Sequence, residues 1–116
     1  MTGTLQENIL FGLPFEQGLY SDVVWACCLE EDFRMMPAGD MTKLGEMGHN
    51  ISGGQKSRIS LARALYRHTA DVVLIDGTLG SLDSKIAKKV MERAVLGHFC
   101  ESKSVVFVTH DLDHAA

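Results

Sequence analysis

The sequence predicts an α/β fold in which a helical portion is followed by a parallel β-α-β unit. Residues 72–75 and 105–108 are short, continuous apolar runs, which is typical of strands buried on both faces of a sheet. Between them, residues 83–96 carry apolar side chains at helical spacing. A strand, a helix and a second strand in this order predict two parallel strands joined by a right-handed crossover.

The N-terminal portion, residues 1–50, is predicted to be a helix, a turn and a second helix. Residues 12–14 contain a glycine and a proline that interrupt helical structure, and a helix is expected from Glu16 to about Leu29. Its apolar stripe consists of Leu19, Val23, Ala26 and Cys27. Residues 37–40 are predicted to form a loop, and residues 42–50 an extended loop because glycine and asparagine recur there.

The second portion, residues 51–116, begins with a helix. Ser52 is a good N-cap residue, so the helix is expected from Gly53 to about Arg67. Its predicted apolar stripe is Ile59, Leu61, Ala62 and Leu65, and its polar face Lys56, Ser60, Arg63 and Arg67.

The β-α-β unit follows this helix. The sequence predicts a strand over residues 71–76, a turn over 77–80, a helix from Asp83 to about Leu96 and a strand over 104–109. A further helix is expected to start near Asp111. In open parallel sheets, functional side chains lie beyond the carboxyl ends of the strands. Asp76 and His110 stand at those ends.

Composition excludes several classes of protein. The 116 residues hold 11 Lys and Arg against 15 Asp and Glu, a net charge of −4, which argues against a general nucleic-acid binder. No apolar run approaches the roughly 20 residues that span a membrane, and no signal peptide is recognised. Cys27, Cys28 and Cys100 fit neither a disulfide framework nor a zinc site, so buried, reduced thiols are expected.

Residues 51–55 have the composition of an anion site. Ser52 offers a hydroxyl, Gly53 and Gly54 allow close approach to the backbone, and the start of a helix presents N–H groups. The same residues also suit an ordinary serine N-cap.

A longer string, residues 48–66, closely resembles the signature motif and following helix of ABC-transporter nucleotide-binding domains, with Ile51 in the usual leucine position. Residues 4–12 resemble the segment after the Q-loop in exporters, particularly the multidrug-resistance-associated and sulfonylurea-receptor branch. The resemblance implies a partial P-loop NTPase fold. Residues 1–50 correspond to the helical subdomain after the Q-loop, and residues 51–116 to the signature, Walker B, D-loop and switch regions.

The resemblance also implies roles for single residues. Ser52, Gly53, Gly54 and Gln55 are expected to close over ATP held by an opposing domain. Asp76 corresponds to the Walker B aspartate that holds Mg²⁺. Asp83 corresponds to the D-loop aspartate that contacts the opposing domain, although it also suits the cap of the next helix.

His110 corresponds to the switch histidine, which hydrogen-bonds the terminal phosphate and the attacking water. A metal site formed by His110 and His114 is the alternative reading, but the glutamate of the H-E-x-x-H motif is absent.

Two departures from the family pattern affect the expected activity. The chain contains no G-x-x-x-x-G-K-[ST] loop, and Gly77 stands where active members have the catalytic glutamate. We therefore expect the C-terminal half of one nucleotide-binding domain, from a longer transporter or a truncated gene, that is inactive alone and has a degenerate site. The strand over residues 105–108 would lack its P-loop neighbour, which predicts poor solubility in isolation.

The expected function is a part of the ATP-binding and hydrolysing domain of an ABC exporter, coupling ATP binding to transport at the cytoplasmic face of a membrane. Its expected partners are a second nucleotide-binding domain, arranged head to tail, and the coupling helices of a transmembrane domain, but no nucleic acid. Two alternatives remain: a non-catalytic ABC-like interaction module, and a chromosome-maintenance-type ATPase lobe. Residues 4–12 and the absence of heptads disfavour the second.

Overall fold

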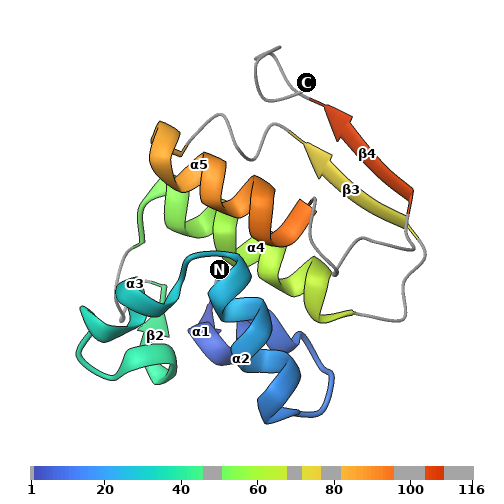
Figure 1. The fold of residues 1–116 in the computed structure, drawn as a ribbon. Helices are drawn as coiled ribbons and strands as arrows, with labels where there is room; N and C mark the ends of the chain where they lie inside the picture. Colours follow the sequence, from blue (N-terminus) through green and yellow to red (C-terminus); the bar gives the residue numbers. More distant parts are fainter. Residues whose placement is uncertain (1, 46–50, 68–71, 77–81, 96–103, 109–116) are drawn as a thin grey trace.

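A computed structural model describes residues 2–45, 51–67, 72–76, 82–95 and 104–108 (Figure 1). These residues form a mixed, mostly helical structure. Figure 1 shows helices α4 (Gly53–Tyr66) and α5 (Ser84–Val90) as a layer between the N-terminal helices and a small parallel sheet. The α/β character predicted from the sequence is confirmed at this level.

The N-terminal segment is held by a cap and a short strand pair. Helix α1 (Leu5–Leu10) begins with a capping box, in which the Thr4 hydroxyl accepts a hydrogen bond from the Glu7 amide and the Glu7 carboxylate accepts one from the Thr4 amide. Strands β1 (Gly3–Thr4) and β2 (Lys43–Leu44) pair antiparallel. The segment predicted to be an extended loop therefore contributes a strand, and this pairing ties it to the start of the chain.

The helix predicted from Glu16 to Leu29 is shorter than expected. Helix α2 spans Gln17–Ala26, because Cys28 adopts a left-handed conformation with φ of 56° that ends the helix. Its predicted apolar stripe is confirmed, since Val23, Ala26 and Cys27 are fully buried.

The chain then forms two short helices before residue 51. Helix α3 (Glu30–Arg34) was not predicted; its first turn is acidic, which complements the positive end of the helix dipole. A single 3-10 turn, η1 (Gly39–Met41), overlaps the predicted loop at residues 37–40.

Helix α4 begins and ends close to the predicted limits. Ser52 is its N-cap, and every residue of the predicted apolar stripe is buried. The helix contacts α1 and α2 and so lies at the centre of the core. The largest fully buried side chains of the core come from α1, α2, α4, α5 and the residue before α3; they are Leu5, Ile9, Val23, Cys27, Leu29, Ile59, Leu65, Tyr66 and Val90.

The two predicted strands form a parallel pair. Strand β3 (Val72–Asp76) pairs with β4 (Ser104–Val108), and Asp76 is in register with Val108. The predicted helix from Asp83 to Leu96 is divided into α5 and a π-helical turn, η3 (Met91–Val95). The predicted turn at residues 77–80 and the helix near Asp111 lie outside the described residues.

Candidate functional site

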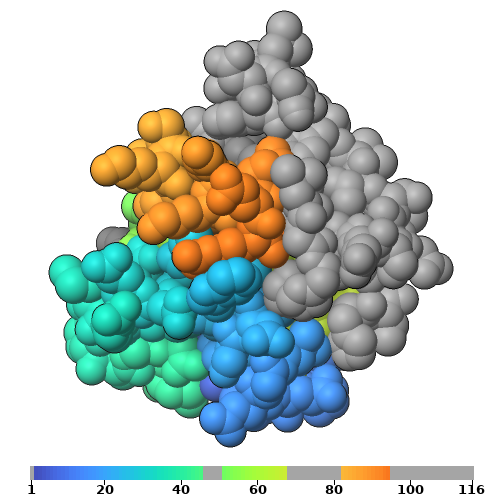
Figure 2. Space-filling view, in the orientation of Figure 1, coloured from blue at the N-terminus to red at the C-terminus, as the bar shows by residue number. Residues whose placement is uncertain are grey.

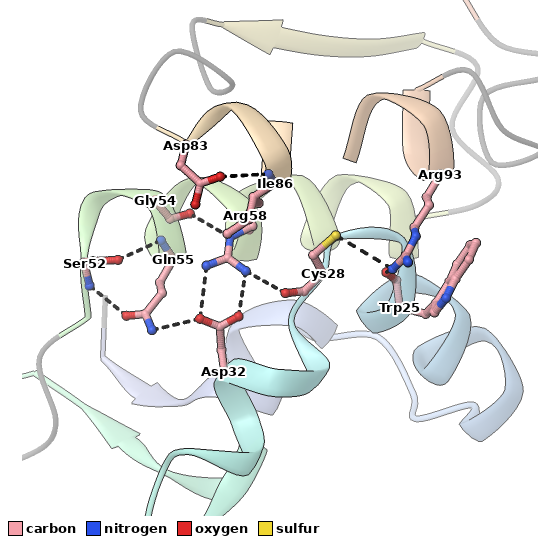
Figure 3. A network of polar contacts seen from close by, with 10 residues as sticks. All are labelled: Trp25, Cys28, Asp32, Ser52, Gly54, Gln55, Arg58, Asp83, Ile86 and Arg93. Atoms are coloured by element: carbon pink, nitrogen blue, oxygen red, sulfur yellow. Dashed lines mark hydrogen bonds and ion pairs between the residues drawn. The ribbon is translucent and has the colours of Figure 1, made fainter. Parts of the chain in front are cut away.

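The start of α4 is organised by a reciprocal pair of hydrogen bonds. The Gln55 amide donates to Ser52 Oγ at 3.1 Å, and the Ser52 amide donates to Gln55 Oε1 at 2.9 Å (Figure 3). The first amides of a helix have no partner within it. The capping box satisfies the amides of Ser52 and Gln55, which leaves those of Gly53 and Gly54 as the donors of the first turn that a ligand can use.

The turn is accessible from outside. Ser52 and Gly53 are exposed. A Cβ atom placed on Gly53 would meet no atom within 4 Å, so the space beside this residue is open. Two glycine amides and a serine hydroxyl at the positive end of a 14-residue helix can therefore be approached by an anion such as a phosphate.

A buried ion pair lies directly behind this turn. Arg58, whose side chain is 5% exposed, donates from Nη1 to Asp32 Oδ2 at 2.6 Å and from Nη2 to Asp32 Oδ1 at 3.1 Å. The same Nη1 also donates to the Cys28 carbonyl at 2.6 Å. Figure 3 shows the Arg58 guanidinium between Asp32 and Cys28, so it joins α4 to the corner between α2 and α3.

Asp32 also contacts the capping glutamine, because Gln55 Nε2 donates to Asp32 Oδ1 at 3.1 Å. Burial alone would raise the pKa of the Asp32 carboxyl. Hydrogen bonds from Arg58 and Gln55, together with the positive charge of Arg58, outweigh burial and hold this pKa below its ordinary value. Asp32 is therefore a carboxylate at neutral pH.

A second arginine joins the same corner to η3. Arg93 donates to the Trp25 carbonyl at 3.1 Å, and its guanidinium lies 4.4 Å from the centroid of the Trp25 ring. It also contacts Cys28 Sγ at 3.8 Å. Figure 2 shows the surface of α5 and η3, in orange, directly against the residues around α2 and α3.

Between these elements lies an open hollow of about 530 Å³. Its walls come from α3, from Gln55 on α4 and from the α5–η3 segment. Helix α3 contributes Glu30, Glu31, Asp32 and Arg34 to the lining, whereas the α5–η3 segment contributes Lys89 and Arg93. The α3 wall therefore carries an excess of acidic groups and the opposite wall only basic ones.

Asp83 is placed as a helix cap. Its side chain accepts a hydrogen bond from the Ile86 amide at 3.0 Å and so begins α5. The capping alternative considered for this residue is therefore confirmed, whereas its contact with an opposing domain stays a prediction.

The structure describes only some of the remaining predicted site residues. Asp76 is the last residue of β3, at the carboxyl end of the parallel pair. Gly77 and His110 lie outside the described residues. Sequence reasoning missed Asp32 and Arg58; the one signal of their role was a charged residue, Arg58, directly beside the apolar stripe of a helix.

The described residues contain no group of three or more His, Cys, Asp or Glu side chains that could hold a metal ion. Within the same part of the chain, no helix has the length and apolar character needed to cross a membrane.

Comparison with known proteins relates the chain to one transporter family. No protein-family model matches it. The chain is 42% identical over 112 residues to ABC transporter C family member 13 of Arabidopsis thaliana and 42% identical over 112 residues to multidrug resistance protein mrp-7 of Caenorhabditis elegans. It is 41% identical over 109 residues to the oligomycin resistance ATP-dependent permease YOR1 of Saccharomyces cerevisiae.

These matches cover 97%, 96% and 94% of the chain but only 8%, 7% and 7% of the respective relatives. The chain thus spans less than a tenth of the length of each of these proteins. The similarity predicted from residues 4–12 and 48–66 is confirmed over nearly the whole chain. By sequence, the chain belongs with one segment of the ABC C-family, or multidrug-resistance-associated, transporters.

Proposed function

We propose that the chain is the signature-to-switch part of a nucleotide-binding domain with the P-loop NTPase fold, within an ABC exporter that couples ATP binding to transport. The observation that carries this proposal is the start of α4, where Ser52 and Gly53 are exposed and Gly54 is half-buried at the positive end of a long helix. Such a turn suits a triphosphate. The similarity to a permease named as ATP-dependent supports this ligand.

The roles of the site residues follow from this proposal. Ser52, Gly53 and Gly54 contact the phosphates of ATP that an opposing nucleotide-binding domain holds, with Gln55 completing the turn. Asp76 and His110 belong to the chain's own site, where Asp76 would hold Mg²⁺ and His110 would contact the terminal phosphate.

The chain's own site is proposed to hydrolyse ATP poorly. Gly77 has no side chain with which to polarise water, and loss of a general base costs about 10²–10⁴-fold in rate. The 116 residues also contain no P-loop, so we propose that they do not bind ATP alone. The signature turn can still serve the opposing site, because its donors do not depend on Gly77.

The proposed partners are a second nucleotide-binding domain and the coupling helices of a transmembrane domain, which would place this segment at the cytoplasmic face of a membrane. The relatives' names as transporters and permeases support this assignment.

A chimera tests the proposal. The segment of YOR1 that matches this chain is replaced by the chain, and the chimera is expressed in yeast lacking YOR1. We expect growth on oligomycin, and we expect Gly53→Asp to abolish it because a carboxylate would then occupy the open space beside this residue. Ser60→Ala, on the exposed face of the same helix, is the matched control and should preserve growth.

Two results would contradict the proposal. One is a chimera that accumulates in the membrane as YOR1 does but gives no resistance. The other is a Gly53→Asp chimera that is as resistant as its parent.

A further inference from the structure

We propose that Asp32 is a positioning residue for the turn formed by residues 52–55, acting through Gln55 and Arg58. The proposal rests on the function proposed above and extends the site to α3, a helix that the sequence analysis did not predict. Asp32 would orient the side-chain amide of Gln55 and, through Arg58, anchor the Gly54 carbonyl.

The orientation of the Gln55 side chain is set by Asp32. A carboxylate can only accept hydrogen bonds, so the NH₂ group of Gln55 must face it. Nε2 indeed donates to Asp32 Oδ1 at 3.1 Å, and Oε1 consequently faces the Ser52 amide at 2.9 Å. If the amide group were reversed, its NH₂ would meet the Ser52 N–H and the capping box would be lost.

The second anchor is Arg58. Its Nε donates to the Gly54 carbonyl at 3.3 Å, one turn back along α4, while its two terminal nitrogens bind both oxygens of Asp32. The guanidinium therefore connects Asp32 to the peptide that follows the Gly54 amide. Since the fork of an arginine is rigid, this geometry restricts the first turn of the helix.

An ion pair of this kind can also be merely structural, holding α3 against α4. Two contacts are sufficient for that purpose: the ion pair between Asp32 and Arg58, and the hydrogen bond from Arg58 to the Cys28 carbonyl at 2.6 Å. The bond from Gln55 to Asp32 adds a link to the capping box itself. A positioning role therefore predicts that ATP-dependent transport is restored when the donor and the acceptor of the Gln55–Asp32 bond are exchanged, so that residue 32 donates and residue 55 accepts.

The test uses the YOR1 chimera in membrane vesicles, with oligomycin transport measured against ATP concentration. We expect Asp32→Asn to raise the half-saturating ATP concentration about tenfold with the maximal rate largely retained, because a hydrogen bond to a charged group is lost. Glu31→Gln is the matched control: it removes a charge from the adjacent, exposed position of α3 and should change neither quantity.

The decisive variant is the double substitution Asp32→Asn with Gln55→Glu. Asn can donate to the new carboxylate, which can still accept from the Ser52 amide, so the link between residues 32 and 55 is rebuilt with opposite polarity, while Arg58 keeps one acceptor, the Asn oxygen, in place of two. We expect the double variant to recover the parental ATP dependence to within about threefold, and hydrogen exchange of residues 52–58 to return to the parental rate.

A double variant whose ATP dependence is no better than that of Asp32→Asn, although both accumulate in the membrane as the parent does, overturns the positioning role. So does an Asp32→Asn chimera that matches Glu31→Gln. Failure of the proposed function is recognised separately, because Gly53→Asp would then also leave transport unchanged.

Discussion

The hydroxyl of Tyr66 joins the end of α4 to the segment before α2. It donates to the Pro14 carbonyl at 2.6 Å and accepts from the Glu16 amide at 2.8 Å, while Tyr66 as a whole is 1% exposed. Removing the hydroxyl leaves two partly buried backbone groups, the Pro14 carbonyl and the Glu16 amide, without this partner, which costs about 1–3 kcal/mol for the two bonds together.

We therefore expect Tyr66→Phe to lower the free energy of local opening between the end of α4 and the segment before α2 by about 1–3 kcal/mol. Hydrogen-exchange mass spectrometry of the chimera should show faster exchange in peptides covering residues 14–20, with Ser60→Ala unchanged. Equal exchange in Tyr66→Phe and the parent would show that the two bonds contribute nothing to local stability.

The carboxylate of Asp32 makes the signature region sensitive to acid. Its pKa in the folded chain lies below the ordinary value of about 3.9. A lowered folded pKa contributes stability that is fully present above the unfolded pKa and is lost as the pH falls through the folded pKa.

The ratio of exchange rates at residues 52–58 between Asp32→Asn and the parent should therefore be largest above about pH 4 and approach one in stronger acid. Taking the ratio at each pH cancels the intrinsic pH dependence of exchange. A ratio that stays constant from pH 6 to the acid limit would rule out a titrating Asp32 in this network.

At the scale of the element, the start of α4 is capped by Ser52 and is proposed to bind phosphate, and one pair of substitutions can separate these two roles. Ser52→Ala removes the cap and should destabilise the first turn by about 1 kcal/mol. Ser52→Asp keeps a capping oxygen but adds a negative charge where phosphate is proposed to bind.

We expect Ser52→Asp to show parental hydrogen exchange at residues 53–58 and no oligomycin resistance in the chimera. Ser52→Ala should show faster hydrogen exchange than the parent at residues 53–58, but a smaller loss of oligomycin resistance than Ser52→Asp. Full resistance in Ser52→Asp would mean that the serine is only a cap.

Elements with local signals could be predicted from the sequence. The cap residues Ser52 and Asp83 mark the starts of α4 and α5, because an N-cap acts within its own turn. The apolar runs predicted β3 and β4 as a parallel pair. Helix α3 and the β1–β2 pair carried no such signal, since α3 has five residues and each strand only two.

The candidate site likewise has a part that the sequence predicted and a part that it did not. The glycine-rich turn is contiguous in sequence and was predicted, together with its capping serine. The bond between Asp32 and Arg58 joins residues that are 26 positions apart, and no spacing rule relates them. Their pairing depends on the left-handed turn at Cys28, which directs α3 toward α4.

At the scale of the whole molecule, the small parallel sheet is a structural vulnerability among the described residues. Among the described residues, β3 and β4 pair only with each other, so each has an edge without a described strand beside it. Their sequences, VVLID and SVVFV, are rich in β-branched residues. Strands of this composition that lack a neighbour on one edge favour association between chains.

We therefore expect the isolated 116-residue chain to self-associate, because strands that find no neighbour within one chain can pair with those of another. Size-exclusion chromatography with light scattering should show species above the monomer mass of 12.7 kDa, with weak near-ultraviolet circular dichroism. The same residues within the chimera are the control, and there they should accumulate in the membrane without aggregation, because the surrounding protein can cover the edges. A monodisperse monomer with a sharp thermal transition would contradict this expectation and show that the described pair of strands needs no further neighbour.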